Sequence, residues 1–98
     1  MVAATGAMGP VQEPTMEEKI PLSVAIITKN EAANLPGCLE SVAFANQIVV
    51  VDSGSDDGTP EIAREFGCEV FLEPWEGFGA QKQAAIDRCR EPWVLVLD

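Results

Sequence analysis

Three groups of polar residues could do chemistry in this sequence, and each stands at the end of a short apolar segment. Thr28 to Glu31 follows the first segment, Asp52 to Gly58 follows the second, and Asp98 follows the last. In open α/β sheets, ligands bind outside the carboxyl ends of the strands. A single Asp at such a place can simply cap the next turn. Three groups that converge at one edge of a sheet favour a binding site.

The composition limits which chemistry these groups can perform. The chain has 98 residues, with 16 Asp and Glu against 6 Lys and Arg, no His, and a formal net charge of -10. This acidic balance argues against nucleic-acid binding, which needs clustered Lys and Arg. The absence of His removes the commonest general base and zinc ligand. We expect the function to rest on carboxylates, backbone amides and a few cations.

Cysteine usage predicts a reducing, cytoplasmic environment. Cys38, Cys68 and Cys89 are far apart, odd in number and without CxxC spacing, which is typical of reduced thiols. Without a His to activate them, they are predicted to be small buried hydrophobes. The chain start has no early basic residue and no apolar core, and no apolar run approaches the roughly 20 residues of a membrane span.

The elements that must position the polar groups alternate between strands and helices. Short apolar runs rich in β-branched residues predict strands over residues 22–28, 48–51, 69–72 and 93–97. Helical spacing and capping residues predict helices that start at Asn34 and at Thr59, where Pro60 takes the first position, and a third over about 80–89. This order predicts an α/β fold, a parallel sheet with helices on both faces.

The domain organisation is predicted to be simple. Residues 1–20 mix Ala, Gly, Pro and Glu without a period, so they are predicted to be a disordered tail that precedes an ordered part, residues 21–98. The last strand runs into Asp98 with no following helix to cover one of its faces. We therefore expect a truncated chain.

Four segments in this order resemble the nucleotide-sugar-binding half of the family 2 glycosyltransferases, which have the GT-A fold. They are SVAIITKNEAANLPGCLESV, IVVVDSGSDDGT, PWEGFGAQKQAAI and WVLVLD, and the resemblance spans residues 22–98. The WEGFGAQK stretch is most similar to bacterial transferases of the lipopolysaccharide-core glucosyltransferase type. The resemblance implies an inverting, metal-dependent enzyme that moves a sugar from a nucleotide-sugar donor, a UDP-sugar, to a saccharide or lipid-linked acceptor.

The same resemblance implies roles for individual residues. The loop that starts at Thr28 would wrap the uridine, with Glu31 at the base or ribose, and Asp52 would accept a hydrogen bond from the uracil N3–H. Lys82 would meet the diphosphate, with a solvated helix lysine as the equal alternative. Asp56 and Asp57 would mostly shape the turn. The predicted nucleotide-binding residues are Thr28, Asn30, Glu31, Asp52, Ser53, Lys82 and Asp98.

A divalent cation, Mg²⁺ or Mn²⁺, is also implied by the resemblance. Asp98 matches the first Asp of the family's DxD motif, which holds the cation against the diphosphate. A dianionic ligand that enters an acidic cleft needs such a counter-cation. The family's catalytic base lies further along the chain, so no catalytic residue is expected here and this chain alone is not expected to transfer sugar. A lipid-linked acceptor would make the full-length protein peripheral to the membrane.

Other functions fit these motifs less well. An EF-hand loop from Asp52 is excluded because Gly54 and Asp57 stand at its third and sixth positions, and Gly54 also excludes a phospho-aspartate phosphatase motif. No P-loop motif occurs. A nucleotidyltransferase of similar layout stays open, although no Gly stands in the loop after the first strand. A non-catalytic nucleotide-binding or interaction module also stays open.

Overall fold

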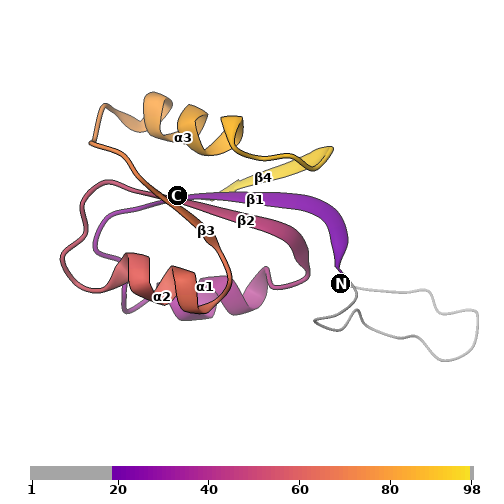
Figure 1. Cartoon of the computed structure of the whole chain (residues 1–98), viewed down its shortest axis with the longest axis horizontal. Helices are drawn as coiled ribbons and strands as arrows, with labels where there is room; N and C mark the ends of the chain where they lie inside the picture. Colours follow the sequence, from indigo (N-terminus) through magenta and orange to yellow (C-terminus); the bar gives the residue numbers. More distant parts are fainter. Residues whose placement is uncertain (1–18, 98) are drawn as a thin grey trace, which may run out of the picture.

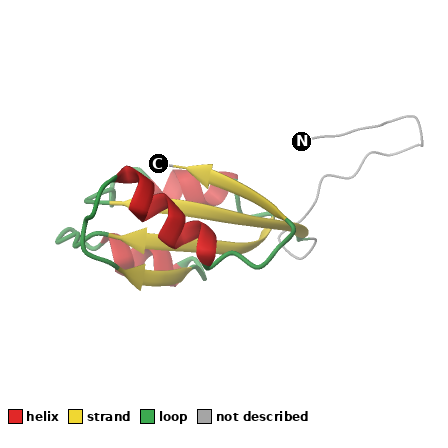
Figure 2. Cartoon of the chain, turned by 90° about the horizontal axis from the view of Figure 1, so that it is seen from above, coloured by secondary structure: helices red, strands yellow, loops and turns green. Residues whose placement is uncertain are grey.

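The computed structural model describes residues 19–97, which form one parallel sheet with helices on both faces. Its strands, in the spatial order β3-β2-β1-β4, are β1 (Ile20–Thr28), β2 (Ala45–Asp52), β3 (Glu69–Leu72) and β4 (Trp93–Leu97). Its helices are α1 (Leu35–Ser41), α2 (Thr59–Glu65) and α3 (Phe78–Asp87). Helices α1 and α2 cover one face and α3 covers the other (Figures 1 and 2). The α/β prediction is confirmed.

The strand register brings the polar groups of β1 and β2 to one edge of the sheet. Thr28 pairs with Asp52 where both strands end, and Ile26 pairs with Leu97 at the end of β4. Because all pairs are parallel, the loops that follow these strands leave from the same edge. This edge is where open α/β sheets bind ligands.

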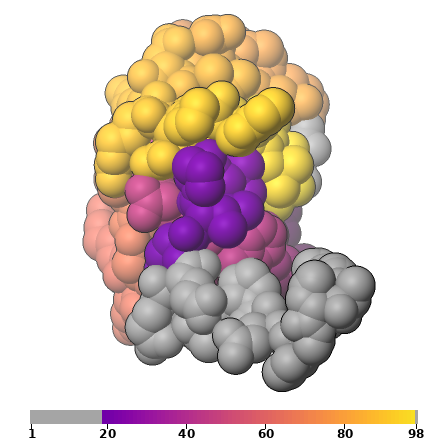
Figure 3. Space-filling view, turned by 90° about the vertical axis from the view of Figure 1, so that its right-hand side faces the viewer, coloured from indigo at the N-terminus to yellow at the C-terminus, as the bar shows by residue number. Residues whose placement is uncertain are grey.

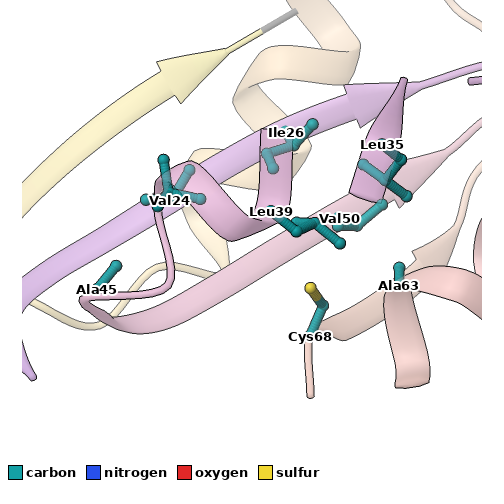
Figure 4. Close-up of a cluster of buried hydrophobic side chains, with 9 residues drawn as sticks. Val24, Ile26, Leu35, Leu39, Ala45, Val50, Ala63 and Cys68 are labelled. Atoms are coloured by element: carbon teal, nitrogen blue, oxygen red, sulfur yellow. The ribbon is translucent and has the colours of Figure 1, made fainter. Parts of the chain in front are cut away.

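Successive residues of the two central strands pack on opposite faces, which explains their continuous apolar sequences. Val24 and Ile26 of β1 and Val50 of β2 lie under Leu35 and Leu39 of α1 (Figure 4). The alternate residues of the same strands pack under α3, and they are Ala25, Ile27, Val49 and Val51 with Ala85 of the helix. The two small cores hold the loops at the carboxyl edge in place.

Strand β4 lies at one edge of the described sheet, although its apolar sequence is typical of a central strand. Its only partner among the described strands is β1, and the two segments lie next to each other in the space-filling view (Figure 3). Trp93 is 70% exposed, and Val94 and Leu95 are also exposed. Within residues 19–97, no helix has the length and apolar character needed to cross a membrane.

Some element boundaries differ from the predicted ones. β1 begins at Ile20, whose N–H donates to the Phe44 carbonyl at 2.9 Å; the rest of the predicted tail, up to residue 18, lies outside the described residues. The cap of α2 is Gly58, not Thr59 as predicted, and its φ of 89° suits glycine. The Asn34 side chain makes no capping hydrogen bond, and its Nδ2 donates to Glu31 Oε1. Helix α3 begins two residues early, at Phe78.

Candidate functional site

The loops after β1 and β2 are joined into one unit at the carboxyl edge of the sheet. The hydrogen bonds that connect them include Ser53 N–H to the Thr28 carbonyl (3.1 Å), Lys29 Nζ to the Gly54 carbonyl (2.9 Å), Asn30 N–H to Ser55 Oγ (2.6 Å) and Asp56 N–H to Asn30 Oδ1 (2.9 Å). The backbone of Asn30 has a φ of 55°, a left-handed conformation that Asn tolerates better than most residues. The polar residues after the two strands therefore position one another.

Asp52 is the buried centre of this unit. Its side chain is 0% exposed and accepts hydrogen bonds from the Thr28 hydroxyl (2.7 Å), the Ser55 hydroxyl (2.5 Å) and the N–H groups of Gly54 (3.0 Å) and Ser55 (2.7 Å). Burial by itself raises the pKa of Asp52, but these hydrogen bonds to the charged form outweigh it, so the pKa is lowered. Asp52 is therefore an ionised group that organises the loops.

The Asp52 carboxylate is covered by the loops that follow β1 and β2. β2 continues through Asp52, and its pairing with Thr28 turns the carboxylate under the loops, where both oxygens accept hydrogen bonds from the protein. A contact between Asp52 and the N3–H of uracil stays a prediction.

Asp57 shapes the turn before α2, as predicted. It accepts hydrogen bonds from the Ala32 N–H (3.1 Å), the Thr59 N–H (3.1 Å) and the Thr59 hydroxyl, and this hydroxyl accepts in turn from the Glu31 N–H (3.0 Å). The hydrogen bond from the Thr59 hydroxyl is the main cause of the lowered pKa of Asp57. The start of α2 is thereby tied to the loop after β1.

A pocket of about 490 Å³ opens beside these loops. It is lined by Ile27, Thr28, Lys29, Glu31, Ser53, Trp75, Phe78 and Gln81. The rings of Trp75 and Phe78 meet edge to face, with 4.9 Å between their centroids, and both are more than half exposed. Apolar walls with a few convergent polar groups are typical of small-molecule sites.

The pocket brings together three of the predicted nucleotide-binding residues, Thr28, Glu31 and Ser53. The others do not line it. The Asn30 side chain lies in the loop network, and the Lys82 ammonium lies 6.0 Å from the Phe78 ring centroid on α3. Asp98 lies outside the described residues. Binding roles for these residues stay predictions.

Among the pocket residues that were not predicted as site residues, Trp75, Phe78 and Gln81 come from the segment that leads into α3. The first two lie in the loop before α3 and at its first position, and Gln81 lies one turn into the helix. Gln81 and Ala85 are four residues apart and both buried, so they share the inner face of α3. The i, i+4 spacing of Gln81 and Ala85 is the sequence pattern that could have placed Gln81 on the inner face of the helix.

The described residues do not by themselves form a metal centre. Within residues 19–97, no three His, Cys, Asp or Glu side chains gather in a way that could hold a metal ion. The Asp57 carboxylate is engaged in the turn, the Asp56 carboxylate is exposed, and Asp98 is not described. The predicted cation therefore rests on the family resemblance.

The cysteines are free thiols, as predicted. Cys68 is buried in the core under α1 and α2, and Cys38 and Cys89 are half-buried against the two cores. Burial raises the pKa of the Cys68 thiol to about 11, with a smaller contribution from Cys38. A thiol with this pKa stays protonated at neutral pH and is a poor nucleophile.

Comparisons with known proteins give one consistent result. Residues 23–98 match the family described as Glycosyl transferase family 2. The chain is 41% identical over 88 residues to the lipopolysaccharide core biosynthesis glycosyltransferase LpsC of Rhizobium meliloti, a match that covers 85% of this chain and 33% of that protein. It is 42% identical over 78 residues to an uncharacterized glycosyltransferase of Rickettsia bellii, covering 79% of this chain and 26% of that protein.

A more distant relative is also named a glycosyltransferase. An uncharacterized glycosyltransferase of Mycobacterium bovis is 31% identical over 77 residues, covering 79% of this chain and 35% of that protein. The chain thus spans about a third or less of the length of these relatives.

Proposed function

This chain belongs to glycosyl transferase family 2, and on that premise we propose that it binds the nucleotide of a UDP-sugar donor for transfer of the sugar to a saccharide or lipid-linked acceptor. The observation that carries the proposal is the pocket at the carboxyl edge of β1 and β2, where Thr28, Glu31 and Ser53 face two aromatic side chains. Nucleotides bind α/β sheets at this edge.

The chemistry of the pocket suits a nucleoside. Trp75 and Phe78 offer aromatic surfaces against which a base can stack. Glu31 is a carboxylate acceptor for ribose hydroxyls or base N–H groups, and Ser53 can donate or accept. Lys29 also lines the pocket and supplies a positive charge in an acidic chain. These groups support nucleotide binding.

Other parts of the proposal rest on family membership. We propose that residues 21–98 are the donor-binding part of a longer catalytic domain, that Lys82 meets the diphosphate, and that Asp98 helps to hold Mg²⁺ or Mn²⁺. The cation would neutralise charge on the leaving nucleotide. Inversion at the sugar, a role in lipopolysaccharide or other glycan synthesis, and a cytoplasmic location at the inner membrane surface belong to the same proposal.

The direct test is nucleotide-dependent stabilisation of the 98-residue chain. Thermal unfolding followed by circular dichroism would be measured with UDP, with ADP and without nucleotide, each with and without Mn²⁺. A ligand at 100 times its dissociation constant stabilises the folded state by about 2.7 kcal/mol. We expect UDP to raise the melting temperature more than ADP, because a purine is larger than the base that the pocket has to enclose.

Two phenylalanine variants localise the binding. Phe78→Ala removes a pocket wall, whereas Phe66→Ala removes an exposed ring at the end of α2, away from the pocket. We expect the UDP effect to fall in the first variant and to persist in the second. No UDP effect in the wild-type chain, or equal losses in both variants, would contradict the proposal.

A further inference from the structure

The Gln81 side chain carries a buried hydrogen-bond donor without a protein partner. Gln81 is 2% exposed and lines the pocket, and within the described part of the chain its Nε2 is buried without a hydrogen-bond acceptor. Leaving a buried amide donor unpaired is costly, and native proteins rarely do so without a reason. The position of Gln81 in a ligand pocket suggests that the acceptor comes from a ligand.

Gln47 shows what this chain does with a buried glutamine that has a purely structural role. Gln47 is 3% exposed, and all its polar capacity is used. Its Oε1 accepts from Ser23 Oγ (2.5 Å) and Arg90 N–H (2.9 Å), and its Nε2 donates to Glu69 Oε1 (3.1 Å) and the Arg88 carbonyl (2.9 Å). The two glutamines are equally buried, so the unpaired donor of Gln81 is not a consequence of burial alone.

We propose that Gln81 recognises the nucleobase: its Nε2 donates a hydrogen bond to the C4 carbonyl oxygen of uracil bound in the pocket. This inference rests on the proposed nucleotide binding and adds the residue that selects the base. The pocket that Gln81 lines is walled by the apolar side chains of Ile27, Trp75 and Phe78, which favour a neutral base over a phosphate as the group enclosed there.

The burial of Gln81 among the residues that line the pocket favours the C4 edge of the base. Gln81 is the most buried of the polar side chains that line the pocket, while Lys29 and Glu31 are exposed. The ribose and diphosphate leave the base from N1 and must reach the open side. The C4 carbonyl is on the opposite edge and therefore reaches deepest. Cytosine carries an amino group at this position, which would set two donors against each other.

The test measures UDP and CDP binding by calorimetry on the 98-residue chain. Gln81→Met keeps the length of the side chain and removes the donor, and Gln83→Met is the matched control on the exposed face of α3. We expect the wild-type chain to prefer UDP and Gln81→Met to lose about tenfold in UDP affinity, the equivalent of one hydrogen bond. The preference for UDP over CDP should disappear in this variant and persist in Gln83→Met.

For Gln81→Met we also expect a change in stability, opposite in direction to the change in UDP affinity. Because Gln81→Met removes an unpaired buried donor, the melting temperature of the nucleotide-free chain should rise while UDP affinity falls. A purely structural role would lower both. Gln81→Glu replaces the donor by an acceptor that suits the cytosine amino group, so the UDP to CDP ratio should move toward CDP.

A ligand change tests the contact without any variant. UDP with sulfur in place of the C4 oxygen offers a weaker acceptor and should bind the wild-type chain less tightly than UDP. Equal affinity for the two ligands, or an unchanged UDP to CDP ratio in Gln81→Met, would overturn the role of Gln81 and leave the proposed nucleotide binding intact. Failure of the wild-type chain to bind either nucleotide would overturn both.

Discussion

The Thr28 hydroxyl donates a 2.7 Å hydrogen bond to the carboxylate of Asp52, its register partner at the carboxyl ends of β1 and β2. Both side chains are buried, and the loops after both strands start from this pair. The same carboxylate also receives the Gly54 and Ser55 N–H groups. One buried charge thus sets the shape of the second loop and its position beside the first.

Replacement of Asp52 tests this organising role. Asp52→Asn places an amide donor where hydroxyl and N–H donors already point, so the free energy of unfolding should fall by about 1–3 kcal/mol. UDP affinity should fall as well. Urea unfolding followed by circular dichroism gives the value. The control is Asp56→Asn, because Asp56 is exposed and its change should stay within about 0.5 kcal/mol. Equal stability of the two variants would contradict the role.

The stability of the fold should decrease at acidic pH. Hydrogen bonds hold the pKa of Asp52 below its unfolded value of about 3.9 despite the opposing effect of burial, so the stability it contributes is complete above that value. It is lost as pH falls through the folded-state pKa, because the unfolded chain then binds more protons. Asp57 and Glu69, whose pKa values are lowered by hydrogen bonds from Thr59 and Arg90, act in the same direction.

Urea unfolding between pH 2.5 and 7 checks this dependence. The free energy of unfolding should be nearly constant above pH 5 and fall below about pH 4. In Asp52→Asn the fall should be smaller, because one of the contributing carboxylates is absent. A fall of equal size in this variant would show that Asp52 does not contribute.

Two glycines should respond in opposite ways to alanine. Gly58 has a φ of 89° and Gly37 lies within α1, and a Cβ at either position meets nothing within 4 Å. Gly58→Ala should destabilise the fold by about 1 kcal/mol from backbone strain alone. Gly37→Ala should stabilise it by about 0.5–1 kcal/mol, because alanine favours the helix. Thermal unfolding of both variants gives the signs, and equal signs would contradict the assigned conformations.

Tryptophan fluorescence should report nucleotide binding from one of two positions. Trp75 lines the pocket, whereas Trp93 lies on β4 and does not line it. We expect UDP to quench the emission of Trp93→Phe, which retains Trp75, and to leave that of Trp75→Phe unchanged. Quenching of Trp93 instead would place the nucleotide elsewhere on the chain.

Cys68 should resist alkylation in the folded chain. With a pKa of about 11, only about one thiol in 10,000 is ionised at pH 7, and the side chain is buried. Iodoacetamide labelling followed by mass spectrometry should modify Cys38 and Cys89 before Cys68, and all three at similar rates in urea. Rapid labelling of Cys68 in the native chain would contradict its burial.

Local sequence patterns determined the class of fold and the edge that carries the site. The β-branched runs of β1 and β2 are apolar on both faces because helices cover both, and only parallel sheets commonly bury both faces. Parallel strands then place their following loops together, so the loops at Thr28 and Asp52 were predictable neighbours. The family could also be identified from the sequence, because each of its motifs lies within one short segment and the motifs occur in order.

Only the tertiary structure decided which side chains face the pocket. Whether Asp52 points outward or under the loops depends on its pairing with Thr28, a residue 24 positions away in sequence. The meeting of Trp75, Phe78 and Gln81 with the loop after β1 likewise depends on the packing of α3 against β1 and β2. Such contacts join residues that are far apart in sequence, so the pattern within a short segment does not predict them. The sequence by itself therefore predicted the binding edge, while long-range packing selected the residues that line it.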